Sequence, residues 1–249
     1  MALDPQIFKD YDIRAVVPDQ LDEAGIKRIA QAIVYCFKPK SVQVGRDMRL
    51  TSASFQKALI DTFLTSGVNV VDLGLTATDM IYYASATYSE DLAITVSASH
   101  NPPEYNGMKM VKKGAIAVSG DSGIYQLRDL AVSNKDLFVK PIQIAKLTQR
   151  NLLPGWVDHV LKFIDLTKMK PFSVVIDAGN AMAGYFMPAF EKQLPWRVTR
   201  LFYDLDGRFP NHLPSPIEPK NMQSLIDKVK AVKADVGMAF DGDGDRVFL

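Results

Sequence analysis

The sequence has little of what marks several classes of protein. Cys36 is the only cysteine among 249 residues, so no disulfide can form within the chain and a zinc site built from cysteines is excluded. No apolar run approaches the roughly 20 residues that a membrane-spanning helix needs. The first residues are partly acidic and lack the apolar core of a secretory signal. We therefore expect a soluble protein of a reducing compartment, the cytoplasm, with no membrane partner.

An excess of either charge is also missing. The 29 basic and 28 acidic residues leave a formal net charge of +1, so no global field favours nucleic acid. Two tryptophans and scattered aromatic residues form no stacking platform for bases. Apolar residues make up 47% of the chain and charged residues 23%, which is typical of a globular protein with a packed core. No nucleic-acid partner is expected.

Strand-like and helix-like segments alternate in both halves of the chain. In the first half, apolar β-branched runs predict strands at 41–45, 68–74, 92–98 and 108–111. Helical spacing of apolar residues predicts helices that begin at Thr51 or Ser52, at Asp79 and near Gly123. In the second half the same patterns predict strands at 172–179, 197–202 and 235–241, and helices at 154–166, 182–192 and 219–234.

This alternation predicts two consecutive α/β domains with mixed, mainly parallel sheets and helices on both faces. We place domain 1 at residues 1–142 and domain 2 at 143–249. The last residues resemble the start of another strand, so we expect domain 2 to be incomplete at Leu249. Polar loops that directly follow apolar strands lie where open α/β sheets bind ligands.

The first such loop, "DGDGDR", contains Asp241, Asp243 and Asp245 with glycine between them. Carboxylates at this spacing can converge on one hard cation, because glycine lets the backbone curl tightly. Oxygen ligands favour Mg²⁺ or Ca²⁺. A solvent-facing Asp-Gly turn or a calcium loop of the EF-hand kind could have the same spacing of aspartates. Spacing alone therefore leaves these alternatives open.

The second loop, "SASHNPPEYNGMK", has Ser99 where an apolar strand ends. Neighbours on a strand point to opposite faces, so His100 is badly placed to act as a base for Ser99. Serine needs a base, a metal or an attached group to act as a nucleophile. A turn capped by Ser99 and Asn101 explains the stretch as well, and from these residues alone it is the favoured reading.

The basic residues carry no function singly. Arg14 and Lys109 each have the pattern of a solvated charge or a surface ion pair. Arg46 next to Asp47 suggests a local ion pair, and His212 lies in a loop whose prolines favour a turn.

Taken together, these motifs resemble the α-D-phosphohexomutases, in their phosphomannomutase/phosphoglucomutase branch. "TVSASHNPPEYNGMK" is similar to the active-site loop of that family, and "DGDGDR" is similar to its magnesium loop. "FKDYDIRA", "VGRDMRLTS" and "DGRFPNHLPSPIEPKN" also resemble family signatures, in the family's order. Ala15 departs from the glycine usual after the arginine.

The resemblance implies a phosphohexomutase that interconverts hexose 6-phosphate and hexose 1-phosphate through a phosphoserine and a bisphosphate intermediate. Ser99 would carry the phosphoryl group, and Mg²⁺ would be held by Asp241, Asp243, Asp245 and a phosphoserine oxygen. The resemblance further implies that Arg246 contacts the phosphoryl oxygens and that Lys109 and Arg14 help to move the proton of the reacting hydroxyl. His100 and Asn101 would shape the loop, with His100 near the substrate.

Members of that family are longer and have four domains, of which this chain matches the first two. We therefore expect the 249-residue chain alone to be inactive. A metal- or phosphate-binding remnant without turnover is the alternative. The choice between mannose and glucose, the pathway and the oligomeric state stay open.

Overall fold

The computed structural model describes residues 3–249, and their contacts divide them into two compact units. Unit 1 comprises the chain up to Thr76 together with Ile81–Ala98 and Glu104–Asn151. Unit 2 comprises Leu152–Leu249 and two short segments from earlier in the chain, Ala77–Met80 and Ser99–Pro103. Among the described residues, no helix is both long and apolar enough to cross a bilayer.

A seven-stranded mixed sheet forms the centre of unit 1, in the order β1-β5-β4-β2-β3-β7, with β6 paired to β5. β2, β3, β4 and β7 pair in parallel, whereas β5 runs antiparallel to β1, β4 and β6. Every residue of β4 is buried, which accounts for its uninterrupted apolar run. The strands are β1 Ile13–Val16, β2 Ser41–Arg46, β3 Asn69–Leu75, β4 Leu92–Val96, β5 Tyr105–Lys112, β6 Ile116–Ala117 and β7 Leu147–Gln149.

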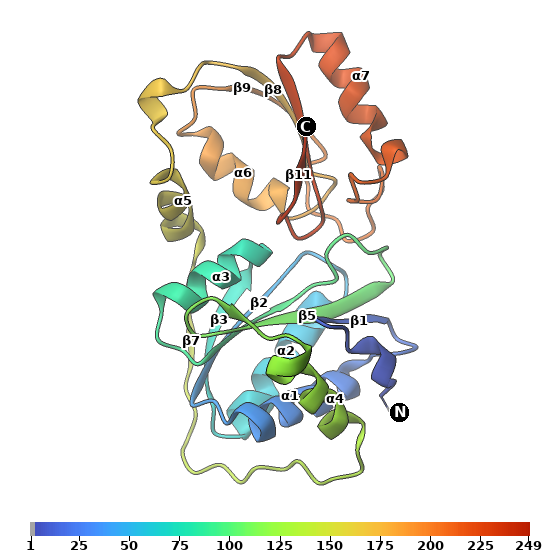
Figure 1. The fold of residues 1–249 in the computed structure, drawn as a ribbon, viewed down its shortest axis with the longest axis vertical. Coiled ribbons are helices and arrows are strands. Elements are labelled where there is room, and N and C mark those ends of the chain that lie inside the picture. The colour runs from blue at the N-terminus through green and yellow to red at the C-terminus, as the bar shows by residue number, and fades with distance from the viewer. Residues whose placement is uncertain (1–2) are drawn as a thin grey trace. The chain divides into compact units, whose positions relative to one another are not determined.

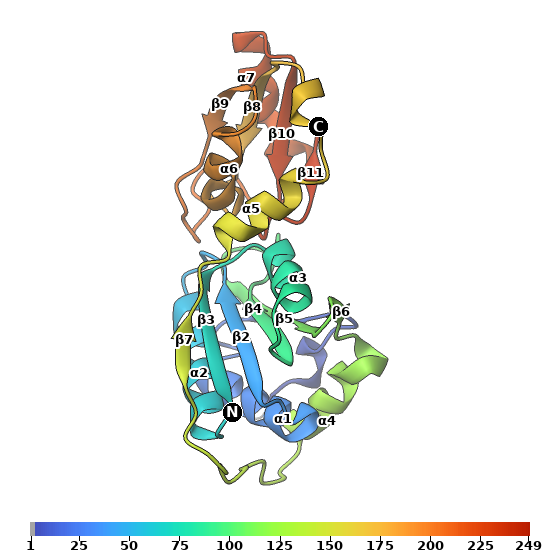
Figure 2. The same cartoon turned by 90° about the vertical axis from the view of Figure 1, so that its left-hand side faces the viewer.

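Helices cover both faces of this sheet (Figure 1). On β2, the side chain of Gln43 donates to the Ala84 carbonyl of α3, while Val44 packs in the core cluster formed with α1 and α2. Neighbouring strand residues point to opposite faces, so α3 lies on one face and α1 and α2 on the other, as Figure 2 also shows. The helical segments are η1 Pro5–Ile7, α1 Glu23–Phe37, α2 Ser52–Thr65, α3 Thr78–Thr87, the π-helical turn η2 Gly120–Ile124 and α4 Tyr125–Val132.

Unit 2 has a smaller sheet, in the order β11-β10-β8-β9. β10, β8 and β9 are parallel, and the short β11 runs antiparallel to β10. The strands are β8 Ser173–Asp177, β9 Arg197–Leu201, β10 Val236–Phe240 and β11 Val247–Phe248. The helical segments are α5 Leu153–Leu161, η3 Leu166–Lys168, α6 Ala183–Glu191, η4 Pro219–Met222 and α7 Gln223–Val232.

Two adjacent residues of β10 separate the two faces of this sheet. Ala239 packs with Val175 and with Leu225 of α7, whereas Phe240 meets Phe186 of α6 edge to face at 5.7 Å between ring centroids. α6 and α7 therefore cover opposite faces. The parallel strands carry their ligand-facing ends on the same edge, and β10 ends immediately before Asp241.

The prediction of two α/β units with mixed sheets and helices on both faces is confirmed, but some element bounds differ. Residues 143–151, assigned from the sequence to the second domain, include β7 and make their contacts in unit 1. The helix predicted at 154–166 ends at Leu161, because Phe163 and Ile164 beyond it are exposed and bury no apolar face. Residues 219–222 form a 3₁₀ turn before α7, so Pro219 does not open the α-helix itself.

α1 was not predicted, although its sequence carries the signal. Ile26, Ile29 and Ile33 recur at helical spacing and are fully buried. Asp22 caps the helix by accepting a hydrogen bond from the Gly25 amide at 2.8 Å.

Gly107 on β5 offers a test of the packing of unit 1. A Cβ atom there would lie 1.8 Å from the Ile13 carbonyl oxygen of β1, so no side chain fits without moving backbone. We expect Gly107→Ala to lower the free energy of unfolding by about 1–3 kcal/mol or more, measured by urea denaturation. Gly114→Asn is the control: a Cβ there meets nothing within 4 Å, and asparagine tolerates its φ of +84°. Equal urea midpoints for the two variants would contradict the packing described.

Candidate functional site

The loop that follows β10 is a tight hairpin. The Asp241 amide donates to the Arg246 carbonyl at 3.1 Å, and the Gly244 amide donates to the Asp241 carbonyl at 3.2 Å. Gly244 has a φ of +75°, a conformation that a side chain disfavours. The turn carries the chain from β10 into the antiparallel β11 and brings every second residue of the loop to one place.

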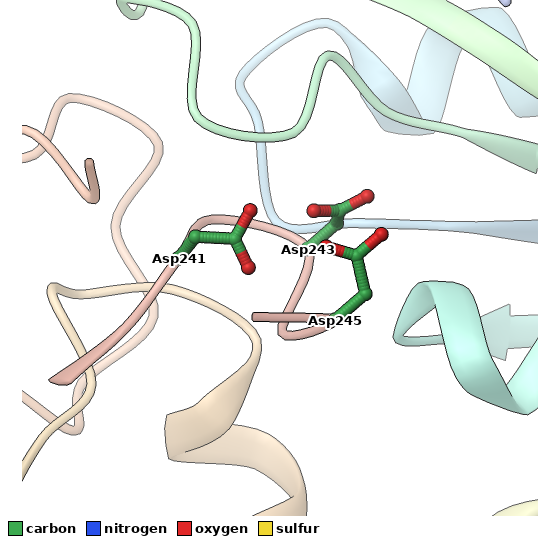
Figure 3. Close-up of side chains that lie close together, drawn as sticks. All are labelled: Asp241, Asp243 and Asp245. Atoms are coloured by element: carbon green, nitrogen blue, oxygen red, sulfur yellow. The ribbon is translucent and has the colours of Figure 1, made fainter. Parts of the chain in front are cut away.

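Those residues are Asp241, Asp243 and Asp245, shown in Figure 3. One oxygen of each lies within 4.8 Å of those of the other two. Asp241 and Asp243 are each 1% exposed, whereas the Asp245 side chain is 23% exposed. Burial first, and then the like charges of the other two aspartates, raise the pKa of Asp241 to about 7. Three crowded carboxylates in a largely dry loop create a strong demand for positive charge.

Arg246 meets part of that demand. Its guanidinium bonds to Asp241 Oδ2, and its Nε lies 3.3 Å from Asp245 Oδ1. Burial opposes the charged guanidinium, but the Asp241 carboxylate outweighs burial and raises the pKa of Arg246. The same guanidinium donates from Nη2 to Ser99 Oγ at 2.8 Å and lies 2.6 Å from His100 Nδ1. Arg246 thus joins the acidic loop to Ser99.

Ser99 is held in a strained conformation beside that loop. It is 1% exposed, and its φ of +53° lies in the left-handed region, which is uncommon for serine. Its hydroxyl donates to Asp241 Oδ2 at 3.1 Å. A Cβ on Gly242 would lie 2.1 Å from the Ser99 carbonyl oxygen, so glycine at 242 permits this close approach. His100 Nδ1 is 3.4 Å from Ser99 Oγ, at the long end for a hydrogen bond, so the structure gives Ser99 no well-placed histidine base.

Thr78, the first residue of α3, is part of the site and was not predicted. Its Oγ1 donates to Asp243 Oδ2 at 2.5 Å, and its amide donates to the Asp243 carbonyl at 3.1 Å. Thr78 is 3% exposed and belongs by its contacts to unit 2. No spacing in the sequence links positions 78 and 243, so this contact could not be found without the fold.

A second unpredicted pair joins His212 to Asp177 at the end of β8. His212 Nε2 lies 3.0 Å from Asp177 Oδ2, and Nδ1 lies 2.9 Å from the Leu213 carbonyl. Both partners accept hydrogen bonds, so the ring must donate from both nitrogens, which only the imidazolium can do. Burial disfavours that charge, but the two bonds outweigh burial and raise the pKa of His212. His212 does lie in a Pro-bounded loop as expected, and it also fastens that loop to the sheet.

The remaining predicted site residues fall in two places. Asn101 belongs to the Ser99–Pro103 segment of unit 2 and is partly buried. Arg14 and Lys109 belong to unit 1, where β1 pairs with β5 so that Arg14 is opposite Gly107. Lys109 is two residues along β5 from Gly107, which places the two cations diagonally on one face of the sheet. Arg14 Nε also pairs with Asp12 at 2.8 Å.

The prediction of an ion pair between Arg46 and Asp47 is wrong. The Asp47 carboxylate is buried and pairs with Arg49 at 3.3 Å, while Arg46 donates only to the Asp47 carbonyl. Burial raises the pKa of Asp47, against the opposing effects of Arg49 and of the Ser52 hydroxyl at 2.5 Å. Adjacent residues leaving a strand diverge, whereas Arg49 can turn back to Asp47.

The acidic loop fits a bound hard cation. Its donor set is three carboxylates with one oxygen of each within 4.8 Å of the others. The pKa of Asp241 is raised by burial and then by the neighbouring negative charges, which a cation would neutralise. Ser99 Oγ lies beside one of those carboxylates and beside a guanidinium, an arrangement suited to a group with several anionic oxygens.

Comparisons with known proteins identify the family of the chain. Residues 5–129 match the family model for phosphoglucomutase/phosphomannomutase α/β/α domain I, and residues 154–249 match that for domain II. A phosphomannomutase of Vibrio cholerae is 39% identical over 97% of this chain, and one of Escherichia coli is 39% identical over the same share.

A crystal structure of a phosphoglucomutase/phosphomannomutase family protein from Burkholderia thailandensis covers 98% of the chain at 38% identity, with a TM-score of 0.87. The chain covers 54% of each of these relatives, so it spans about half of their length. On both family models and on the identity of its relatives, the chain belongs to the phosphoglucomutase/phosphomannomutase family.

Proposed function

We propose that this chain supplies the phosphoryl carrier and the metal site of a phosphohexomutase, which interconverts the 6-phosphate and the 1-phosphate of a hexose. One observation carries the proposal: Ser99, in a strained backbone conformation, has its hydroxyl 3.1 Å from Asp241 and 2.8 Å from Arg246. Relatives named phosphomannomutase support the substrate class. Mannose and glucose phosphates are both within it.

In the proposed reaction, phosphorylated Ser99 gives its phosphoryl group to a free hydroxyl of a hexose monophosphate. The bond between Ser99 Oγ and phosphorus breaks as the bond from the sugar oxygen to phosphorus forms. The proton of that hydroxyl passes to a base, proposed to be the neutral amine of Lys109, and is given back to the sugar oxygen that the second transfer frees. The resulting bisphosphate returns its other phosphoryl group to Ser99, so the enzyme is restored and the product is the isomeric monophosphate. Serine here is a carrier, and its weak nucleophilicity is offset by neighbouring charge.

The carboxylates of Asp241, Asp243 and Asp245 are the proposed ligands of Mg²⁺, with an oxygen of phosphorylated Ser99 as a further ligand. Bound there, Mg²⁺ would neutralise negative charge around the reacting phosphorus. The carboxylate-only donor set and its crowding support a hard divalent cation.

Other residues are assigned to binding and proton movement. Arg246 is proposed to hold phosphoryl oxygens, which its guanidinium matches bidentately. Lys109 and Arg14, cations on one face of the sheet of unit 1, are proposed to serve the reacting hydroxyl, with Lys109 the group that can exchange its proton. His100 and Asn101 are proposed to shape the loop around Ser99, with His100 near the substrate.

Phosphorylation of Ser99 is the direct test. After incubation with a hexose 1,6-bisphosphate and Mg²⁺, intact-mass measurement should detect one phosphate on the chain. The adduct should be absent from Ser99→Ala, because that variant lacks the hydroxyl that lies against both Asp241 and Arg246. Ser97→Ala, which removes a hydroxyl two residues earlier, should keep the adduct. An unmodified wild-type chain, or a phosphate that persists in Ser99→Ala, would refute the proposed carrier.

The raised pKa of Asp241 predicts how the metal site responds to pH. Its folded-state pKa, about 7, lies above the ordinary value of 3.8. Binding of a proton to Asp241 therefore stabilises the metal-free fold. This stabilisation is complete when the pH is below 3.8 and is lost as the pH rises through 7. A cation replaces that proton. We therefore expect the Mg²⁺-induced rise in Tm to be small at pH 5.5 and large at pH 8.

Two variants separate this effect from other titrations. Asp241→Asn should abolish the Mg²⁺-induced rise at both pH values. His212→Asn removes a different buried group of this unit whose pKa is raised, and it should leave the pH dependence of the rise unchanged. A rise of equal size at pH 5.5 and pH 8 in the wild-type chain would count against the assignment.

The length of the chain favours a second candidate function, a metal- and phosphate-binding remnant without turnover. The chain spans about half of its relatives' length, and substrate positioning can supply roughly 7–11 kcal/mol of barrier reduction. We expect the 249-residue chain, assayed alone, to convert mannose 1-phosphate at a negligible rate while still accepting a phosphate on Ser99. Measurable conversion of mannose 1-phosphate by the purified chain, lost in Ser99→Ala, would exclude the remnant.

A further inference from the structure

The carboxylates of the acidic loop have both charged and neutral partners. Asp241 and Asp245 are paired with the guanidinium of Arg246, a cation. Asp243 Oδ2 accepts a hydrogen bond from the neutral hydroxyl of Thr78. A neutral donor can orient a carboxylate without competing with a metal as a cation does.

Thr78 holds Asp243 at two points. Its amide, at the first position of α3, has no partner within the helix and donates to the Asp243 carbonyl at 3.1 Å. Its hydroxyl donates to the carboxylate at 2.5 Å. The first bond fixes the main chain of the loop, and the second fixes the plane of the carboxylate.

The contact is also dry and closely packed. Thr78 is 3% exposed and Asp243 is 1% exposed, so bulk water does not compete for the hydrogen bond between the Thr78 hydroxyl and the Asp243 carboxylate. A Cβ on Gly244 would lie 3.8 Å from the Ala77 side chain and 2.6 Å from a ring carbon of Phe186, which leaves the loop little room to shift. The carboxylate of Asp243 is therefore oriented by Thr78 before any ligand arrives.

We propose that Thr78 is a positioning residue for the metal site, which sets the orientation of the Asp243 carboxylate toward a divalent cation. Residues that hydrogen-bond to metal ligands in this way contribute to affinity because the ligand does not have to be ordered when the metal binds. In this role Thr78 acts through Asp243, to which both of its hydrogen bonds run. The inference rests on the proposed function of the acidic loop as a metal site.

Isothermal titration of the chain with MgCl₂ and with MnCl₂ tests the proposal. Thr78→Val keeps the size, the branching and the backbone bond and removes only the hydroxyl. We expect Thr78→Val to raise both dissociation constants by about 10–100-fold. Thr78→Ser, which keeps a hydroxyl, should have dissociation constants within about threefold of the wild-type values. Thr78→Ala is measured alongside and should match Thr78→Val, so either variant can decide the matter if the other fails to fold.

A control separates positioning from a general loss of stability. The Thr62 hydroxyl is also buried and donates to the Ala58 carbonyl of α2 at 2.7 Å, in unit 1. Thr62→Val should therefore leave metal affinity unchanged. The metal-free Tm of each variant is recorded by circular dichroism, and a drop in Tm with no change in metal affinity would assign Thr78 a structural role only.

The outcomes also separate this inference from the function on which it rests. Metal binding by the wild-type chain that Thr78→Val and Thr78→Ala leave unchanged would overturn the role of Thr78 and leave the metal site intact. A wild-type chain that binds neither Mg²⁺ nor Mn²⁺ would overturn the metal site itself, and the role of Thr78 with it.

Discussion

The site depends on the repulsion among three aspartates that the chain forces together. Asp241 and Asp243 are almost completely buried, and one oxygen of each of the three carboxylates lies within 4.8 Å of those of the other two. Burial and like charge both work against ionisation, which is why the pKa of Asp241 rises to about 7. Such an arrangement is stable only with a counter-charge, and Arg246 provides one through Asp241 and Asp245. The acidic loop thus concentrates negative charge that needs a cation beside it.

Packing of the backbone keeps this loop and the serine together. Glycine at 242 allows the Ser99 carbonyl to approach closely, and glycine at 244 allows the left-handed turn against Phe186. The strained φ of Ser99 is maintained by the same contacts, which is consistent with strain stored at functional sites. A larger residue at 242 would push away the hydroxyl that contacts Asp241. The geometry around Ser99 is therefore set by the missing side chain at Gly242 as much as by the polar groups.

The sequence predicted what periodicity and strand ends encode. The buried β4 and β10, and the polar loops directly after them, follow from apolar runs that stop at Ser99 and Asp241. α1 was overlooked although its isoleucines carry the helical pattern. The contacts of Thr78 with Asp243 had no local signal, because 165 residues separate the partners and only the fold joins them. The pairing of His212 with Asp177 is of the same kind.

A common feature links the contacts that could not be predicted. Thr78 orients Asp243, and His212 fastens its own loop to the end of β8, so both act on residues at the carboxyl ends of strands. Beyond the end of a strand the sheet no longer fixes the direction of the side chains, because the ladder of backbone hydrogen bonds ends there. Side chains that must point in a fixed direction beyond that limit need holding by hydrogen bonds from elsewhere in the chain. Holding a side chain in place at the end of a strand therefore requires partners distant in sequence, which is why local patterns locate the candidate site residues and miss the residues that orient them.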